Sequence, residues 1–180
     1  MRARLRPAMT PAELAEVYAV PHDARRWADH QVRVRESIAF IRETVGPVGH
    51  AADLSCGNGQ IIDGIDATFR TKGDFAPGYP VQGPIESTLA DLPHVDLFIC
   101  SETLEHLDDP DSVVNRLRDK TDWLFVSTPA WETPQHNNPE HYWSWGLDDI
   151  SDMLTRAGFT DQRMRLLPLG FYTFQLWIAR

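Results

Sequence analysis

The stretch of sequence that decides the fold is DLSCGNG, which occupies residues 53–59. It follows a short apolar run, residues 51–54, and precedes a helical pattern over residues 60–67. Glycines at such a junction let the backbone turn sharply and let a ligand approach its N–H groups closely. A short Gly-x-Gly pattern is as typical of a plain tight turn as of a ligand site, so its meaning depends on the rest of the chain.

The rest of the chain alternates apolar runs of strand length with helical patterns. The runs cover residues 51–54, 69–73, 96–100 and 123–127, and helices are predicted after Thr10-Pro11, over residues 23–44, after Asp109 and over residues 148–157. Two further runs, residues 162–167 and 171–179, predict an antiparallel hairpin at one edge of the sheet. The pattern predicts one α/β domain with a seven-stranded, mostly parallel sheet and one antiparallel edge strand.

Length and composition support a single domain. The 180 residues, 42% of them hydrophobic, are enough for one real core. We expect residues 1–46 to form a helical segment packed on a domain of residues 47–180. Cys56 and Cys100 end apolar runs and form no CxxC pair, which favours reduced core thiols. The sequence shows no run of 18 apolar residues and no cleavable apolar leader after its basic start, which predicts a soluble, cytoplasmic protein.

Charge argues against one class of partner. A formal net charge of −9 disfavours broad contact with a phosphate backbone, so nucleic acid is not the expected partner. The predicted helix over residues 23–44 has Trp27, Val34, Ile38 and Ile41 at apolar positions, and its basic residues Arg25, Arg26, Arg33 and Arg35 alternate with acids. This mixture favours a solvated helix face over a binding patch.

A glycine loop of this kind needs an acid at the end of the next strand, about 20 residues on, to accept hydrogen bonds from ribose hydroxyls. Asp66 and Asp74 compete for that place. A helix crossing back over the sheet needs roughly 10 residues, and only Asp74 leaves room for it. Asp74 is therefore the predicted acid, and Asp66 is expected to be a surface helix residue.

In their order along the chain, these features resemble the class I S-adenosylmethionine-dependent methyltransferases of the small-molecule type. Residues 53–59 match the family pattern Asp-x-Gly-x-Gly-x-Gly, with Ser55 in place of its first glycine, and the likeness continues through Asp74, residues 83–86, 96–109 and 123–159. The resemblance implies a Rossmann-like fold. Nicotinamide binding is disfavoured, because Ile62 stands where a third glycine would pack.

The resemblance also implies where S-adenosylmethionine lies. The glycine loop would surround its methionine part, Asp74 would hold the ribose, and Phe75 and Ile85 would flank the adenine. The implied cofactor-binding residues are Asp53, Ser55, Cys56, Gly57, Asn58, Gly59, Asp74, Phe75, Ile85, Glu86 and Ser101. Glu86 is included because Pro84 stands where the family often has an acid.

One crossover helix of the family is predicted to be missing. Between Asp74 and Val81 the chain has only FAPGYP, which is too short and too rich in proline and glycine for a helix. The sheet face near this edge must then be covered by the N-terminal helices or by another chain, as in a homodimer.

The stretch CSETLEH, residues 100–106, follows a predicted buried strand and contains two carboxylates and an imidazole. In a helical turn, Glu102, Glu105 and His106 would share one face. The resemblance here is to methyltransferases that carry Glu-x-x-Glu-His and a later histidine and bind a divalent metal, and it implies Mg²⁺ or Mn²⁺ ligands at Glu102, Glu105, His106 and His141. The same glutamate and histidine also occur in methyltransferases without a metal. There, His106 or His141 would serve as a general base.

The sequence also suggests roles for the remaining histidines and for a group of aromatic residues. His136 is a weaker candidate base, and ordinary roles are expected for His22, His30, His50 and His94. The long loop after the fifth strand concentrates aromatic area, as an acceptor pocket or lid would, in Trp131, Tyr142, Trp143 and Trp145. The alternative is that two of them simply pack beneath the loop.

The sequence therefore predicts an S-adenosylmethionine-dependent methyltransferase that acts on an oxygen or nitrogen of a small molecule. Two alternatives stay open: a metal-dependent RNA 2′-O-methyltransferase, favoured by Glu-x-x-Glu-His, and a catalytically inactive cofactor-binding module. The missing helix and the departures at Ser55 and Pro84 motivate the second.

Overall fold

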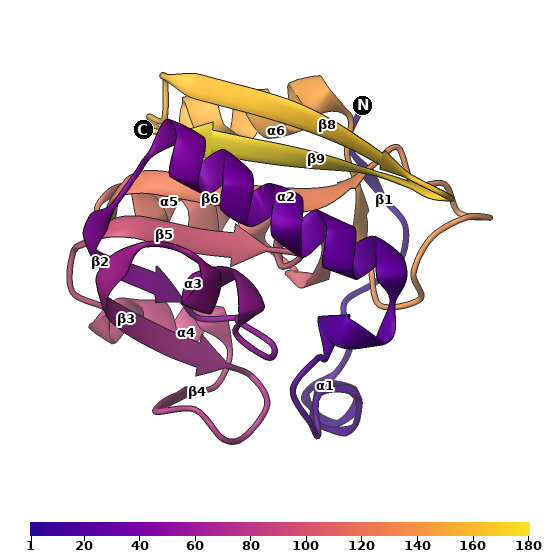
Figure 1. The fold of residues 1–180 in the computed structure, drawn as a ribbon. Coiled ribbons are helices and arrows are strands. Elements are labelled where there is room, and N and C mark those ends of the chain that lie inside the picture. The colour runs from indigo at the N-terminus through magenta and orange to yellow at the C-terminus, as the bar shows by residue number, and fades with distance from the viewer.

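A seven-stranded sheet forms the centre of the molecule, with the strand order β4-β3-β2-β5-β6-β9-β8 (Figure 1). The computed structural model describes residues 1–180, apart from the side chain of Ala24. The strands are β2 (Val48–Asp53), β3 (Ala67–Asp74), β4 (Val81–Gln82), β5 (Val95–Ser101), β6 (Thr121–Ala130), β8 (Gln162–Leu169) and β9 (Tyr172–Ala179). The five neighbouring strands β4, β3, β2, β5 and β6 are parallel to one another, which confirms the predicted fold class.

The antiparallel strand lies one position inside the edge. β9 pairs antiparallel with both β6 and β8, so the predicted hairpin is present, but β8 is the edge strand. The burial pattern explains this order. Most of β9 is buried on both of its faces, whereas exposed and partly buried residues alternate along β8. A strand buried on both faces belongs inside a sheet, and a half-exposed one is suited to its edge.

Helices cover both faces of the sheet. On one face, α2 (Ala28–Thr44) and α3 (Gln60–Gly64) pack on a cluster that includes Ile41 and Phe125, and Figure 1 shows α2 crossing in front of the strands. On the other face lie α4 (Ile85–Thr88), α5 (Pro110–Arg118) and α6 (Leu147–Arg156), around Phe98 and Trp145. Among the described helices, none combines the length and apolar composition needed to cross a membrane.

The connection between β2 and β3 is shorter than predicted. The helix ends at Gly64 after five residues, and the chain is already extended at Ile65. A Cβ on Gly64 would lie 2.3 Å from Cδ1 of Ile38, so the glycine allows α3 to approach α2 closely. The expectation of a longer crossing helix was therefore wrong. Asp74 nevertheless ends β3, and Asp66 is exposed in the loop before it rather than in a helix.

The N-terminal segment is not a simple run of helices. The predicted start at Thr10 is confirmed, since Thr10 and Glu13 form a capping box on α1 (Pro11–Val17). The predicted helix over residues 23–44 is instead divided into a 3-10 turn, η1 (Ala24–Arg26), and α2. Trp27 separates them in an extended conformation and is 48% exposed, so it does not belong to the apolar face of the helix.

The missing crossover helix is confirmed within the described chain. β3 and β4 are parallel and are joined by an irregular turn, with Gly73 opposite Val81. A Cβ on Gly73 would lie 2.9 Å from the carbonyl oxygen of Val81, so the glycine permits this close pairing. Phe69 on β3 is 68% exposed, which shows that the N-terminal helices leave part of this edge uncovered.

The aromatic loop packs into the fold. Trp145 and Tyr142 are buried, and Trp143 lies beneath the guanidinium groups of Arg2 and Arg4, at 4.1 and 4.8 Å from its ring centroid. The two-residue strands β1 (Ala3–Arg4) and β7 (Trp143–Ser144) pair and hold this arrangement in place. Cation–π contacts and burial therefore give these rings a structural role.

Replacing Trp145 by alanine is expected to lower the free energy of unfolding by about 3 to 5 kcal/mol, because the substitution leaves a cavity in the core. Denaturant unfolding monitored by circular dichroism measures this change. Trp131→Ala is the matched control, because Trp131 lies in the same loop and is 53% exposed. A loss of less than about 1 kcal/mol at Trp145 would show that the loop does not contribute to the core.

Candidate functional site

A cavity of about 610 Å³ opens at the carboxyl ends of β2, β3 and β5. All but one of the predicted cofactor residues line it. They are Asp53, Ser55, Cys56, Gly57, Asn58, Asp74, Phe75, Ile85, Glu86 and Ser101. Cys56 is partly buried in the cavity wall rather than in the core, whereas Cys100 is fully buried, and both thiols are free. Parallel sheets place ligands at this end of their strands, and the volume suits a small-molecule site.

Two carboxylates hold the glycine loop. Oδ1 of Asp53 accepts a hydrogen bond from the Ser55 N–H at 3.0 Å, and Oδ2 of Asp74 accepts one from the Gly57 N–H at 2.7 Å. Gly57 has φ +54°, a conformation that favours glycine. Gly59, at φ +77°, begins α3 and lies beside the side chains of Asp63 and Lys72, outside the cavity lining.

The N-terminal segment closes over the glycine loop. A Cβ on Gly57 would lie 2.9 Å from the carbonyl oxygen of His22, and Nδ2 of Asn58 donates to Asp23 at 2.8 Å. His22 and His30 both line the cavity, although the sequence predicted ordinary roles for them. The break at Trp27, which a continuous helical pattern does not reveal, brings this part of the chain over the loop.

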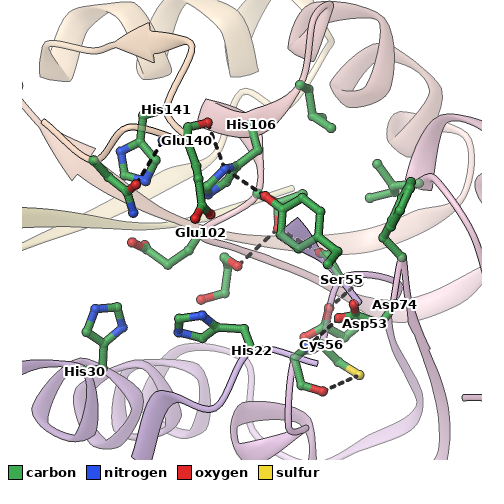
Figure 2. Close-up of a pocket in the computed structure, with 18 of the residues that line it drawn as sticks. His22, His30, Asp53, Ser55, Cys56, Asp74, Glu102, His106, Glu140 and His141 are labelled. Carbon is green, nitrogen blue, oxygen red and sulfur yellow. Dashed lines mark hydrogen bonds between the residues drawn. The ribbon is translucent and has the colours of Figure 1, made fainter. Parts of the chain in front are cut away.

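A second group of polar side chains lies at the other end of the cavity, where His106 and His141 line the wall and Glu105 is fully buried outside the lining. Ligand atoms of Glu105, His106 and His141 all lie within 4.8 Å of one another. Figure 2 shows the two imidazoles together, away from Asp53 and Asp74. Their ring centroids are 4.7 Å apart. His141 therefore lies beside His106 and Glu105 in this cluster.

Glu102 does not join this cluster, contrary to the prediction. It has φ +51° and precedes a 3-10 turn, η3 (Leu104–His106), so residues 102–106 do not form the helical turn that would give them a common face. Its Oε1 instead accepts a hydrogen bond from Ser127 Oγ at 2.8 Å. The same oxygen lies 4.0 Å from Nη1 of Arg33.

Both imidazoles are held at Nδ1. His106 Nδ1 lies 3.1 Å from the carbonyl oxygen of Glu140 and 3.2 Å from the hydroxyl of Tyr18. His141 Nδ1 lies 2.7 Å from Oε2 of Glu132. Carbonyl and carboxylate oxygens only accept hydrogen bonds, so in the neutral form of each ring Nδ1 carries the proton and Nε2 carries the lone pair. Nε2 is thus the atom through which each imidazole can accept a proton or bind a metal ion.

Glu132 is a candidate residue that the sequence analysis missed. Its side chain is buried, and its Oε1 also accepts a hydrogen bond from the backbone N–H of Asn138 at 3.1 Å. The preceding residue, Trp131, has φ +58°, and this left-handed turn marks the point where the chain leaves β6. An irregular loop separates Glu132 from His141, so no periodic pattern links them in the sequence.

Burial sets the protonation of the cluster. It lowers the pKa of His106 to about 3, so this imidazole is neutral at physiological pH. Burial would also lower the pKa of His141, but the hydrogen bond to Glu132 and the charges of Glu105 and Glu132 outweigh it and raise that pKa. Burial raises the pKa of Glu105, and Glu102 adds to the shift.

Comparisons with known proteins agree with this geometry. Magnesium protoporphyrin IX methyltransferase from Synechocystis, solved with bound SAH, matches with a TM-score of 0.61 at 20% identity over 84% of each chain. The 1,6-didemethyltoxoflavin-N1-methyltransferase from Burkholderia thailandensis matches with a TM-score of 0.68 at 15% identity over 97% of this chain and 92% of its own. The N-methyltransferase NodS from Bradyrhizobium japonicum gives 0.68 at 14% identity over 94% and 96%.

This chain has the class I methyltransferase fold. The sequence itself matches no protein-family model and no curated protein, so the likeness lies in the structure. Relative to that fold, the glycine loop and Asp74 stand at the ends of β2 and β3, as the sequence predicted. The aromatic residues of the long loop do not line the cavity, so the predicted acceptor pocket is not formed by Trp131, Tyr142, Trp143 and Trp145.

The stability of the folded protein is expected to depend on pH because of Asp53. Burial raises its pKa to about 8, so the folded protein holds a proton on this carboxyl at neutral pH and the unfolded chain does not. Stability therefore falls as the pH rises toward the folded pKa, and it is greatest below the unfolded value of about 3.9. Between about pH 6.5 and 8.5, the free energy of unfolding of the ligand-free protein is expected to fall.

Asp53→Asn removes this titration and is expected to make the fall in stability shallower over the same interval, where Glu105, whose pKa is raised to about 8, still contributes to the fall. Urea unfolding at a series of pH values measures both slopes. Asp63→Asn serves as the matched control, because Asp63 is exposed on α3. Parallel profiles for the wild type and Asp53→Asn would show that Asp53 is already ionised in the folded protein.

Proposed function

We propose that this protein is an S-adenosylmethionine-dependent methyltransferase that transfers the methyl group to an oxygen or nitrogen of a small-molecule acceptor. One observation carries the proposal. A single cavity joins the glycine loop, held by Asp53 and Asp74, to a cluster that contains the imidazoles of His106 and His141. A nucleotide-type subsite and a proton-accepting subsite would then share one cavity.

The first end of the cavity supports cofactor binding. The Ser55 and Cys56 side of the loop would contact the methionine part, together with Ser101 at the end of β5. Ser55 Oγ is hydrogen-bonded to Thr103 at 2.7 Å, which ties the glycine loop to residues 100–106. Asp74 would hold the ribose. S-adenosylmethionine supplies an electrophilic methyl group when it is bound.

Adenine would lie between Phe75 and Ile85, which line the cavity beyond Asp74. Tyr18 packs against Phe75, with ring centroids 5.7 Å apart, so the N-terminal segment also covers this part of the cavity. Glu86 lines it as well and is exposed, which leaves its carboxylate free to accept from the adenine amino group.

The other end of the cavity supports methyl transfer to a protonated nucleophile. An in-line displacement requires that the acceptor be aligned with the methyl group and that a hydroxyl or amine lose its proton. The Nε2 lone pair of His141 or His106 would accept that proton, and His141 is the stronger base of the two, because its pKa is raised whereas burial lowers the pKa of His106 to about 3. Glu132 orients His141, and Tyr18 together with the Glu140 carbonyl orients His106. Tyr18 and His22 of the N-terminal segment line the same cavity and would help to exclude water from the reacting groups.

The same cluster fits a divalent ion. Glu105 Oε1 is buried and has no hydrogen-bond partner among the described residues, while its Oε2 accepts from Thr128 at 3.0 Å. The contact between Glu132 and His141 is the kind of support that orients metal-bound imidazoles. Without Glu102, the set is two nitrogens and one oxygen, which suits Mn²⁺ better than Mg²⁺. A bound ion would lower the pKa of an acceptor hydroxyl.

Formation of methylated product tests the function. The protein is incubated with S-adenosylmethionine labelled in its methyl group and a panel of small hydroxylated and amine-containing acceptors, and products are detected by mass spectrometry. Label is expected in at least one acceptor, and a His106→Ala, His141→Ala double variant is expected to lose turnover while it still binds S-adenosylhomocysteine. Cofactor binding without transfer to any acceptor would favour the inactive-module alternative.

The RNA alternative receives no support from the cavity. Of the described residues that line it, Arg33 alone is an arginine or lysine, and the lining includes the carboxylates of Asp29, Glu102 and Glu140. Phosphate backbones draw most of their affinity from several cationic contacts. A small molecule therefore fits this cavity better than an RNA end.

A further inference from the structure

We infer that Arg33 is a carboxylate-binding residue of the cavity and that a carboxylate of the bound ligand completes its hydrogen bonding. The inference rests on the proposed function and deepens it. The sequence placed Arg33 on a solvated helix face, but the side chain is only 4% exposed and lies in the cavity wall. A guanidinium buried in such a place is costly unless it is paired.

The hydrogen bonds of Arg33 are incomplete. Its Nη1 donates to Ser101 Oγ at 2.7 Å and to Ser127 Oγ at 3.4 Å, and its Nη2 contacts His30 Nδ1 at 3.4 Å. Its Nε is buried and has no partner among the described residues. The edge of the guanidinium formed by Nε and Nη2 thus carries only one long contact. This is an edge that can hold a carboxylate with two parallel hydrogen bonds.

The charge of Arg33 is also incompletely matched. Among the described residues, Glu102 has the one carboxylate within 4.0 Å of the guanidinium nitrogens, and its Oε1, 4.0 Å from Nη1, already accepts from Ser127 at 2.8 Å. The ring of Phe174 lies 5.6 Å from the guanidinium carbon. An apolar wall on one side strengthens electrostatic attraction to an anion on the other, because the local dielectric constant is low.

Arg33 lies between the two halves of the cavity, so a carboxylate can reach it from either ligand. Its contact with Ser101 places it beside the glycine loop, where the methionine part of the cofactor is proposed to lie. Its contact with His30 places it beside Phe174 and Tyr172, which line the cavity away from the loop. The source is therefore the carboxylate of the cofactor or a carboxylate of the acceptor, and two sets of probes distinguish them.

The first arm measures the affinities of S-adenosylhomocysteine and 5′-methylthioadenosine by calorimetry. The second compound keeps the nucleoside and the sulfur but lacks the amino-acid end. Arg33→Met is the test variant, and Arg35→Met is its matched control, because Arg35 is exposed on the same helix. If Arg33 binds the cofactor carboxylate, Arg33→Met weakens S-adenosylhomocysteine by at least about tenfold and leaves 5′-methylthioadenosine unchanged.

The second arm measures the binding of 4-hydroxybenzoate and 4-hydroxybenzamide to the complex with S-adenosylhomocysteine. Planar probes are chosen because Trp27, Tyr172 and Phe174 offer aromatic rings to the cavity. If Arg33 binds an acceptor carboxylate, the wild type prefers the benzoate by at least about tenfold, and Arg33→Met loses that preference with S-adenosylhomocysteine affinity intact.

Thermal unfolding of each variant verifies its fold. Arg33→Lys, which keeps the charge but not the planar fork, replaces Arg33→Met if the latter does not fold. Unchanged affinity for S-adenosylhomocysteine together with no carboxylate preference in the wild type would overturn the inference. Absence of binding of both nucleosides to the wild type would overturn the proposed function instead, and the inference with it.

Discussion

Asp74→Ala is expected to weaken the binding of S-adenosylhomocysteine by about 100-fold, which corresponds to about 2.7 kcal/mol. The carboxylate of Asp74 has two expected roles. It accepts hydrogen bonds from the backbone N–H groups of Gly57 and Ala76, at 2.7 and 2.9 Å, and so fixes the glycine loop. It would also accept from the ribose of the ligand. Calorimetric titration of the purified variant measures the change.

Asp66→Ala is the matched control for Asp74. Asp66 is the competing acid in the sequence, and the structure places it on the surface, 3.3 Å from Arg42. Its removal is expected to leave affinity for S-adenosylhomocysteine unchanged. An Asp74→Ala variant that folds and binds within about twofold of the wild type would show that the nucleotide subsite lies elsewhere.

The second large effect concerns the cluster at the other end of the cavity. Mn²⁺ is expected to bind the wild type, and Glu105→Gln is expected to weaken this binding by about 100-fold or more, because an anionic ligand is replaced by a neutral amide. Glutamine has nearly the same shape and can still accept from Thr128, so the buried site stays filled. Electron paramagnetic resonance of free Mn²⁺ in a titration measures both affinities.

His136→Ala is the control for this titration. His136 is exposed in the same loop as His141, where it pairs with Thr133, and it lies outside the cluster. Its variant should bind Mn²⁺ like the wild type. Equal affinities in the wild type and Glu105→Gln would contradict the metal proposal and would leave His106 and His141 to act as bases on their own.

Local patterns in the sequence predicted where the glycine loop and the acid after the next strand lie in the fold. The glycine loop and Asp74 lie at consecutive strand ends, and strand ends are readable from apolar runs and glycines. Asp74 lies at the end of β3, as predicted, although the helix that crosses back before this strand is shorter than expected. The crossing helix has only five residues, and the strand-forming residues that follow Ile65 decide where β3 begins.

Positions that depend on tertiary packing were harder to predict. The spacing of Glu102, Glu105 and His106 indicates a common face only if the turn is α-helical, and the positive φ of Glu102 breaks that condition. A group of aromatic residues in a loop can pack into the core or line a ligand pocket, and the sequence does not distinguish the two. In the structure, Arg2 and Arg4 cover the ring of Trp143, so this ring packs within the fold.

The N-terminal contribution to the site could not be read from periodicity. Residues 23–44 have a continuous helical pattern, yet the chain bends at Trp27 and brings His22 over Gly57. Arg33 looks like one of several alternating charges, and only its burial against Ser101 and Ser127 sets it apart. These contacts join residues that are far apart in the sequence, so no local sequence pattern predicts them.

The central claim is that the cavity binds the methyl donor through the glycine loop and Asp74. Calorimetric titration of the purified wild-type protein with S-adenosylhomocysteine tests it most directly. We expect saturable binding at one site per chain and an upward shift in melting temperature that grows with ligand concentration. Absence of both binding heat and a melting shift at concentrations up to about 1 mM would contradict it.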